Sequence, residues 1–250
     1  MSAKEIAALR GELEATRAER DRFYRWANGF VDFTEGPARS NLDNWRQLQD
    51  KGYFENHPNH QGLRAFGSGE VEIIEQFKKL DDTQQVVVIG CGYGRDVAEI
   101  APRVAHVYGI DVNRTILEKA VAFLSERRVG NFTPVLAEDY DRVIPGGIDL
   151  VFCFVVTQHL TRDLTRDYLD RLGRKLSATG VLVVQFLETM VEGETFLDAR
   201  LEDYEPSVSW TVTQIHRMAW QCGLDTVEVR TQPVAGGAAL WHWACLRRRA

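Results

Sequence analysis

A glycine-rich loop follows an apolar run in the middle of the chain. Gly90, Gly92 and Gly94 are spaced G-x-G-x-G at the end of the run VVVIG. Glycine lets the backbone turn sharply and approach a ligand closely, and the N-terminus of a following helix favours a negative group. Asp111 ends the next apolar run, where its carboxylate can accept hydrogen bonds from both hydroxyls of a ribose. The pattern predicts a nucleoside-binding site.

Two classes of nucleoside ligand fit this pattern in outline. A dinucleotide site has the spacing G-x-G-x-x-G. Counted from Gly90, the third glycine position of that motif is occupied by Arg95. The spacing therefore disfavours a dinucleotide.

With this spacing, the sequence resembles the class I S-adenosylmethionine-dependent methyltransferases, whose first motif is an apolar strand followed by GxGxG. The resemblance covers roughly residues 70–250, and VVVIGCGYGRD, VYGIDVNRTILEKA, VLAEDY and IDLVFCFVVTQHL match the family's motifs in order. It implies S-adenosyl-L-methionine as cofactor, with Asp111 on the ribose and Asp139 near the adenine amino group. The implied cofactor contacts are Gly90, Cys91, Gly92, Gly94, Asp111, Val112, Asp139, Tyr140 and Phe154.

His159 is the candidate catalytic residue. It follows the apolar run 148–156, at the sheet edge where open α/β folds bind ligands. A histidine, with an ordinary pKa of about 6.5, suits a general base that takes a proton from an acceptor hydroxyl. The alternative is a histidine that caps or packs the following helix. Some quinone-pathway O-methyltransferases carry EVIEHV here and bind metal, but VVTQHL lacks both glutamates, so we expect no metal at this segment.

Three further residues are weaker substrate-binding candidates. His57 and His60 lie in ENHPNHQG, which a polar turn around Pro58 explains equally well. Glu188 ends a predicted strand at the ligand edge and precedes an acidic stretch that a solvated face also explains. His242 lies in a strand between two tryptophans, which favours a structural role.

The predicted elements alternate between helix and apolar strand from residue 70 onward. Helices are expected at 70–80, from 95, and at 114–127, 163–176 and 211–223; strands are expected at 86–90, 106–111, 132–138, 148–156, 181–188, 224–232 and 238–248. This order predicts an α/β fold, a doubly wound, seven-stranded, mostly parallel sheet with an antiparallel C-terminal pair. Ala178-Thr179-Gly180 is expected to stop the fourth of these helices.

The chain divides into three predicted parts: a helix in 1–30, a mixed aromatic cap in 31–69 and the methyltransferase-like domain in 70–250. Ile6, Leu9 and Leu13 begin a heptad seam whose middle is polar. Such a helix either pairs with a copy in a homodimer or packs on its own chain. Similar charged helices precede methyltransferases of bacterial glycan assembly.

Composition narrows the choice of partners. The chain has 30 basic and 36 acidic residues, a net charge of −6, and a pI near 5.6, which disfavours a nucleic-acid binder. No apolar run is long enough to span a membrane, and the first residues lack the apolar core of a signal peptide, so we expect a cytoplasmic protein. Four cysteines form no CxxC pair, which disfavours a thiolate zinc site.

The motifs also disfavour some classes of methyl acceptor. Enzymes that methylate amino groups of DNA bases carry [DN]PP[YF] where this chain has Cys153-Phe154-Val155-Val156, and no Pro-Cys dipeptide is present for attack on cytosine. We therefore expect O-methylation of a sugar, glycan or related small molecule. The alternatives are N-methylation of an amino sugar, peptide or other small amine, and a non-catalytic partner subunit that keeps the fold.

Overall fold

The computed structural model describes Trp45 and residues 70–189, 208–234 and 239–249. The predicted N-terminal helix, most of the cap segment, and His57 and His60 lie outside the described residues. The division at residues 30 and 69 therefore stays a prediction.

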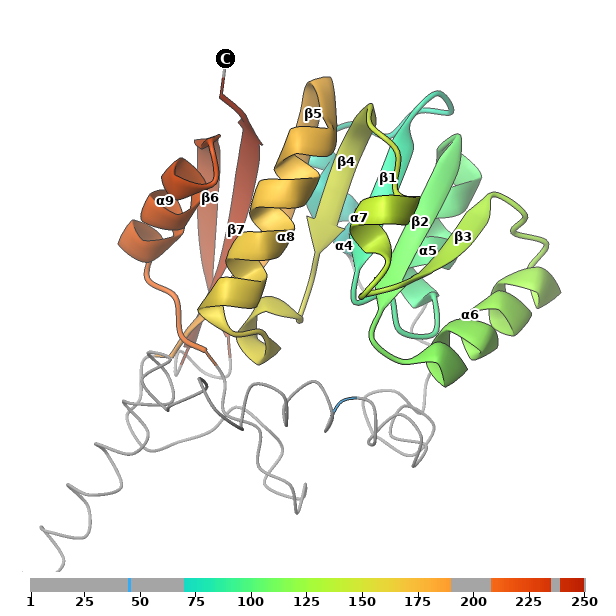
Figure 1. The fold of residues 1–250 in the computed structure, drawn as a ribbon. Coiled ribbons are helices and arrows are strands. Elements are labelled where there is room, and N and C mark those ends of the chain that lie inside the picture. The colour runs from blue at the N-terminus through green and yellow to red at the C-terminus, as the bar shows by residue number, and fades with distance from the viewer. Residues whose placement is uncertain (1–44, 46–69, 190–207, 235–238, 250) are drawn as a thin grey trace, which may run out of the picture.

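Seven strands form one sheet in the order β3-β2-β1-β4-β5-β7-β6 (Figure 1). The strands are β1 (Gln85–Ile89), β2 (His106–Asp111), β3 (Phe132–Leu136), β4 (Ile148–Cys153), β5 (Leu176–Thr189), β6 (Leu224–Val234) and β7 (Ala239–Arg248). The first five are mutually parallel, and β7 runs antiparallel to β5 and β6. The predicted sheet is confirmed, including its antiparallel C-terminal pair.

Helices cover both faces of the sheet. They are α4 (Glu70–Glu75), α5 (Arg95–Ile100), α6 (Arg114–Glu126), α7 (Tyr140–Val143), α8 (Arg162–Lys175) and α9 (Val212–Gln221), with short 3-10 turns η1 (Ala101–Arg103) and η2 (Thr157–His159). Figure 1 shows α7, α8 and α9 in front of the sheet and α4 and α5 behind it. Each face has its own buried apolar cluster, which is why β1 is apolar at consecutive positions from Val86 to Ile89.

The helix predicted at 163–176 is confirmed as α8, which ends at Lys175, and residues 178–180, which were expected to stop it, lie inside β5. Gly180 lies inside this strand, and a Cβ there would clash with the carbonyl oxygen of Ile148. The pairing of β4 with β5 is also irregular between Ile148 and Leu150. The glycine therefore marks a close approach of two backbones within the sheet, and a turn is not required to explain it.

Thr211 caps the N-terminus of α9, and its loss provides a test of local stability. Its hydroxyl accepts from the backbone nitrogen of Gln214, and the Gln214 side chain accepts from the backbone nitrogen of Thr211. We expect Thr211→Ala to lower the free energy of unfolding by about 1 kcal/mol, measured by urea denaturation. Thr213→Ala, at an exposed position inside the same helix, should not lower it. Equal stability of the two variants would contradict the capping role.

Candidate functional site

The glycine loop connects β1 to α5 and lies against the segment after β4. Gly90, Gly92 and Gly94 have φ angles of 70°, 50° and 81°, a left-handed conformation that favours glycine. A Cβ on Gly90 would clash with the Val156 side chain. The spacing seen in the sequence therefore reflects both backbone conformation and a close contact across the edge of the sheet.

Asp111, at the end of β2, is hydrogen-bonded to this loop. Its side chain is buried, one carboxylate oxygen accepts from the backbone nitrogen of Gly92 at 3.0 Å, and the other accepts from the backbone nitrogen of Asn113 at 3.2 Å. Each oxygen is therefore held in place by a backbone nitrogen. A carboxylate oxygen can accept more than one hydrogen bond.

The segment after β4 has an unusual backbone. The predicted strand 148–156 ends early, at Cys153, and Val155 has a φ of 56° with its side chain 43% exposed. A β-branched residue rarely adopts this conformation. Gln185 in β5 holds the segment: its side-chain oxygen accepts from the backbone nitrogen of Val155 at 2.7 Å, and its backbone oxygen accepts from the Thr157 hydroxyl at 2.5 Å.

Gln185 is a residue that the sequence reasoning missed. Its side chain is fully buried, although it interrupts the apolar run VLVVQFL. A polar residue at such a position is costly unless it is hydrogen-bonded. That single polar residue in a buried strand was the available signal, and its bond to Val155 gives the reason for it.

His159 is the last residue of η2 and is nearly buried, at 9% exposure. Its backbone nitrogen donates to the Val156 oxygen at 2.8 Å. Its ring makes an edge-to-face contact with Trp45, at a centroid distance of 4.8 Å. The structure therefore brings His159 to the segment that contacts Gly90, and packs it against an aromatic residue of the predicted cap.

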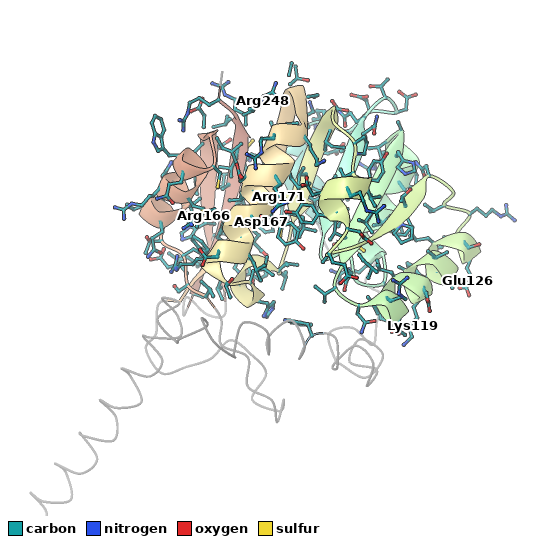
Figure 2. All side chains as sticks on the ribbon, viewed as in Figure 1. Lys119, Glu126, Arg166, Asp167, Arg171 and Arg248 are labelled. Carbon is teal, nitrogen blue, oxygen red and sulfur yellow. The ribbon has the colours of Figure 1, made fainter. Side chains whose placement is uncertain are left out.

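Asp139 and Tyr140 lie after β3, at the start of α7. One oxygen of Asp139 accepts from Arg142 at 2.8 Å, and the Tyr140 hydroxyl donates to Asp167 at 2.6 Å. Figure 2 shows Asp167 on α8, near Arg171 of the same helix. Burial, and then the Asp167 carboxylate, raise the pKa of Tyr140 above its ordinary value. Because its ring also packs on Tyr168, the Tyr140 side chain faces α8, and a cofactor contact from this residue would come from its backbone.

The other sequence-predicted cofactor residues lie beside these elements. Cys91 is buried in the glycine loop, where its backbone nitrogen donates to the Ile110 oxygen at 2.9 Å; burial raises the pKa of its thiol well above the ordinary value. Phe154 is buried after β4 and contacts Trp243 edge to face at 4.5 Å between centroids. Val112 follows Asp111 and is half-buried.

Glu188 lies near the end of β5, and its side chain is 23% exposed. One oxygen is 2.7 Å from Nε2 of the buried His242 in β7. The other ring nitrogen of His242 is 2.8 Å from the hydroxyl of Thr231 in β6. The structure therefore places His242 against Glu188. The two residues are 54 positions apart, and no pattern in the sequence indicated this pairing.

These residues share one edge of the sheet. The carboxyl ends of β1, β2, β4 and β5 meet there because these strands are parallel, and antiparallel β7 contributes its N-terminal end. The order of the strands reverses between β1 and β4, and open α/β sheets bind their ligands at such a switch point. In the described part of the chain, no cluster of three or more His, Cys, Asp or Glu side chains could hold a metal, and no helix is long and apolar enough to cross a membrane.

The fold and this edge define the class of the protein. The sheet order, the antiparallel last strand and the glycine loop joined to Asp111 are those of a class I, Rossmann-like methyltransferase. Residues 87–182 match the family model described as a methyltransferase domain. This match covers part of the sheet, from β1 to β5, and agrees with the motifs seen in the sequence. No curated protein matches the chain in sequence.

Solved structures share this fold at low sequence identity. Magnesium protoporphyrin IX methyltransferase (ChlM) from Synechocystis PCC 6803, with bound SAH, is 16% identical over 83% of this chain and 99% of that chain, with a TM-score of 0.60. Geranyl diphosphate C-methyltransferase from Streptomyces coelicolor A3(2) is 12% identical over 83% and 98%, with a TM-score of 0.63. The [4+2]-cyclase SpnF is 12% identical over 72% and 80%, with a TM-score of 0.58. These proteins are named for different reactions, so the fold alone does not fix the chemistry.

Proposed function

We propose that the chain binds S-adenosyl-L-methionine and transfers its methyl group to a hydroxyl of a sugar, glycan or related small molecule. The observation that carries the proposal is the hydrogen bond from the Gly92 nitrogen to Asp111, which joins the glycine loop to the predicted ribose carboxylate. The methyltransferase domain match supports the proposal, and so does the bound SAH of a protein with this fold.

The proposed cofactor contacts are divided among three strand ends. Asp111 would accept from the ribose hydroxyls, Asp139 would accept from the adenine amino group, and Gly90, Cys91, Gly92 and Gly94 would line the rest of the cofactor. Val112, Tyr140 and Phe154 complete the proposed set. The Asp139 carboxylate has one oxygen bonded to Arg142, and a carboxylate has further capacity to accept.

The bound cofactor supplies a methyl group on a positively charged sulfur, which leaves as a neutral thioether when the methyl moves to the acceptor oxygen. The protein mostly has to hold the acceptor in line with that methyl group. The hydroxyl also has to lose its proton, and we assign His159 as the base that takes it. Val155 and Val156, between β4 and His159, would form the wall beside the reacting groups.

Isothermal titration calorimetry tests the proposed cofactor. We expect S-adenosylmethionine and S-adenosylhomocysteine to bind and NAD not to bind, because the loop lacks the third glycine of a dinucleotide site. Binding of NAD alone would overturn the proposal. Binding of neither class of nucleoside would favour a partner subunit that keeps the fold without the activity.

A homodimer through the N-terminal helix is a separate proposal. It rests on the heptad spacing of Ile6, Leu9 and Leu13. Light scattering on the full-length protein should give the mass of a dimer, and deletion of residues 1–27 should shift the mass toward a monomer. A full-length monomer at tens of micromolar would show that this helix serves its own chain.

A further inference from the structure

Three side chains form a continuous hydrogen-bonded chain across the last three strands of the sheet. Thr231 of β6 and Phe186 of β5 are both register partners of His242 in β7, and Glu188 follows Phe186 by two residues on the same face. The Thr231 hydroxyl is 2.8 Å from Nδ1 of His242, and Nε2 of His242 is 2.7 Å from Glu188. We call this set the Glu188–His242–Thr231 chain.

The proton positions in this chain follow from the chemistry of its end groups. An ionised carboxylate can only accept hydrogen bonds, so Nε2 of His242 carries a proton and donates it to Glu188. In the neutral ring, Nδ1 then accepts from the Thr231 hydroxyl. Both ring nitrogens of a side chain that is 1% exposed are thereby satisfied. The bonds fix the orientation of the Glu188 carboxylate.

Only one of the two carboxylate oxygens of Glu188 takes part in the hydrogen bond to His242. The oxygen Oε2 of Glu188 accepts from His242, while Oε1 has no hydrogen-bond partner among the described residues. The side chain is 23% exposed and lies at the sheet edge that holds the glycine loop and Asp111. Oε1 therefore keeps its capacity to accept a hydrogen bond.

We propose that Oε1 of Glu188 accepts a hydrogen bond from a hydroxyl of the methyl acceptor, which is a polyhydroxylated compound without anionic groups, such as a sugar. The inference rests on the proposed function and names the acceptor class for the same site. A negative charge at this position repels phosphate and carboxylate groups, so it selects against anionic acceptors. His242 and Thr231 act as positioning residues, because they contact Glu188 and not the acceptor.

Saturation-transfer NMR on the full-length protein saturated with S-adenosylhomocysteine tests this subsite. The probes are D-glucose, D-galactose, D-mannose and L-rhamnose. Glu188→Gln keeps an oxygen that can accept from His242 but removes the charge, so the fold should be retained. Glu228→Gln is the matched control, because Glu228 is an exposed carboxylate on β6 that pairs with Arg230. Calorimetry with S-adenosylhomocysteine on the same samples reads the cofactor site separately.

We expect at least one of the four sugars to bind the wild-type protein and the Glu228→Gln variant alike. In Glu188→Gln its dissociation constant should rise about tenfold, the usual effect of losing a hydrogen bond to a charged group. Equal affinity in Glu188→Gln, or no binding of any of the four sugars to wild type, would overturn the subsite. Loss of S-adenosylhomocysteine binding in wild type would instead overturn the proposed function, so the two failures are distinguishable.

Discussion

Replacing Asp111 with alanine is expected to weaken binding of S-adenosylmethionine about 10- to 150-fold, which corresponds to about 1.5–3 kcal/mol for hydrogen bonds to a charged group. Two losses act together. The proposed ribose contacts disappear, and the backbone nitrogens of Gly92 and Asn113 lose the oxygens that now accept from them. Asp111→Asn should be nearly as weak, because its amide nitrogen must face one of these two donors. Isothermal titration calorimetry measures the change.

Asp149→Asn is a matched control for this substitution. Asp149 also accepts from a backbone nitrogen, that of Gln85, and from the Ser177 hydroxyl. It lies near the start of β4, at the opposite edge of the sheet from Asp111. We expect its replacement to change the free energy of unfolding and to leave cofactor affinity unchanged. If Asp111→Ala also bound the cofactor normally, the ribose role would belong to another residue.

Local features of the sequence were sufficient to predict the sheet and the glycine loop that lies beside Asp111. The consecutive apolar residues of β1 are buried on both faces, which is the behaviour of a central parallel strand. The three glycines follow that strand immediately and have positive φ angles. The position of Asp111 at the end of β2 was enough to predict that it lies beside these glycines. Each of these inferences depends on residues within one strand and its following loop.

The pairings of Gln185 and Glu188 depend on contacts between distant strands, and the sequence did not predict them. Gln185 holds Val155 across 30 residues of sequence, and Glu188 meets His242 across 54. The sequence around either residue of these pairs does not indicate its partner, because the register between strands is set only when the sheet is packed. Gly180, which was expected to stop a helix, lies inside β5 for a similar reason, because its backbone approaches that of Ile148 closely.

His159→Ala is expected to lower kcat about 10²- to 10⁴-fold, the usual contribution of a general base. His159 follows the segment whose Val156 packs on Gly90, so its place is beside the proposed methyl-transfer site. Cofactor affinity should barely change, because the proposed cofactor contacts come from other loops. His159→Gln should be nearly as inactive, since an amide keeps a hydrogen bond but cannot take the proton. Release of S-adenosylhomocysteine in the presence of an acceptor measures the rate.

Three comparisons separate a catalytic from a structural role for His159. The ring is nearly buried against Trp45, so a packing role alone would lower the melting temperature and leave the pH dependence of the rate unchanged. A base would instead produce a rising limb of the pH–rate profile that the alanine variant lacks. His216→Ala, at an exposed position on α9, should match wild type in both measurements. Near-normal turnover of His159→Ala would move the assignment to Glu188, His57 or His60.

The same variant distinguishes the two kinds of acceptor. A hydroxyl must lose its proton when its oxygen takes the methyl group, so its methylation depends on a base at the moment of transfer. An amine that is already neutral at the working pH attacks through its free electron pair, so the alanine variant should lose much less of its rate. Measured on one neutral sugar and on D-glucosamine, a large loss with the sugar and a small loss with the amine would identify His159 as the hydroxyl base. Equal losses with both would show that the residue positions the acceptor and does not take its proton.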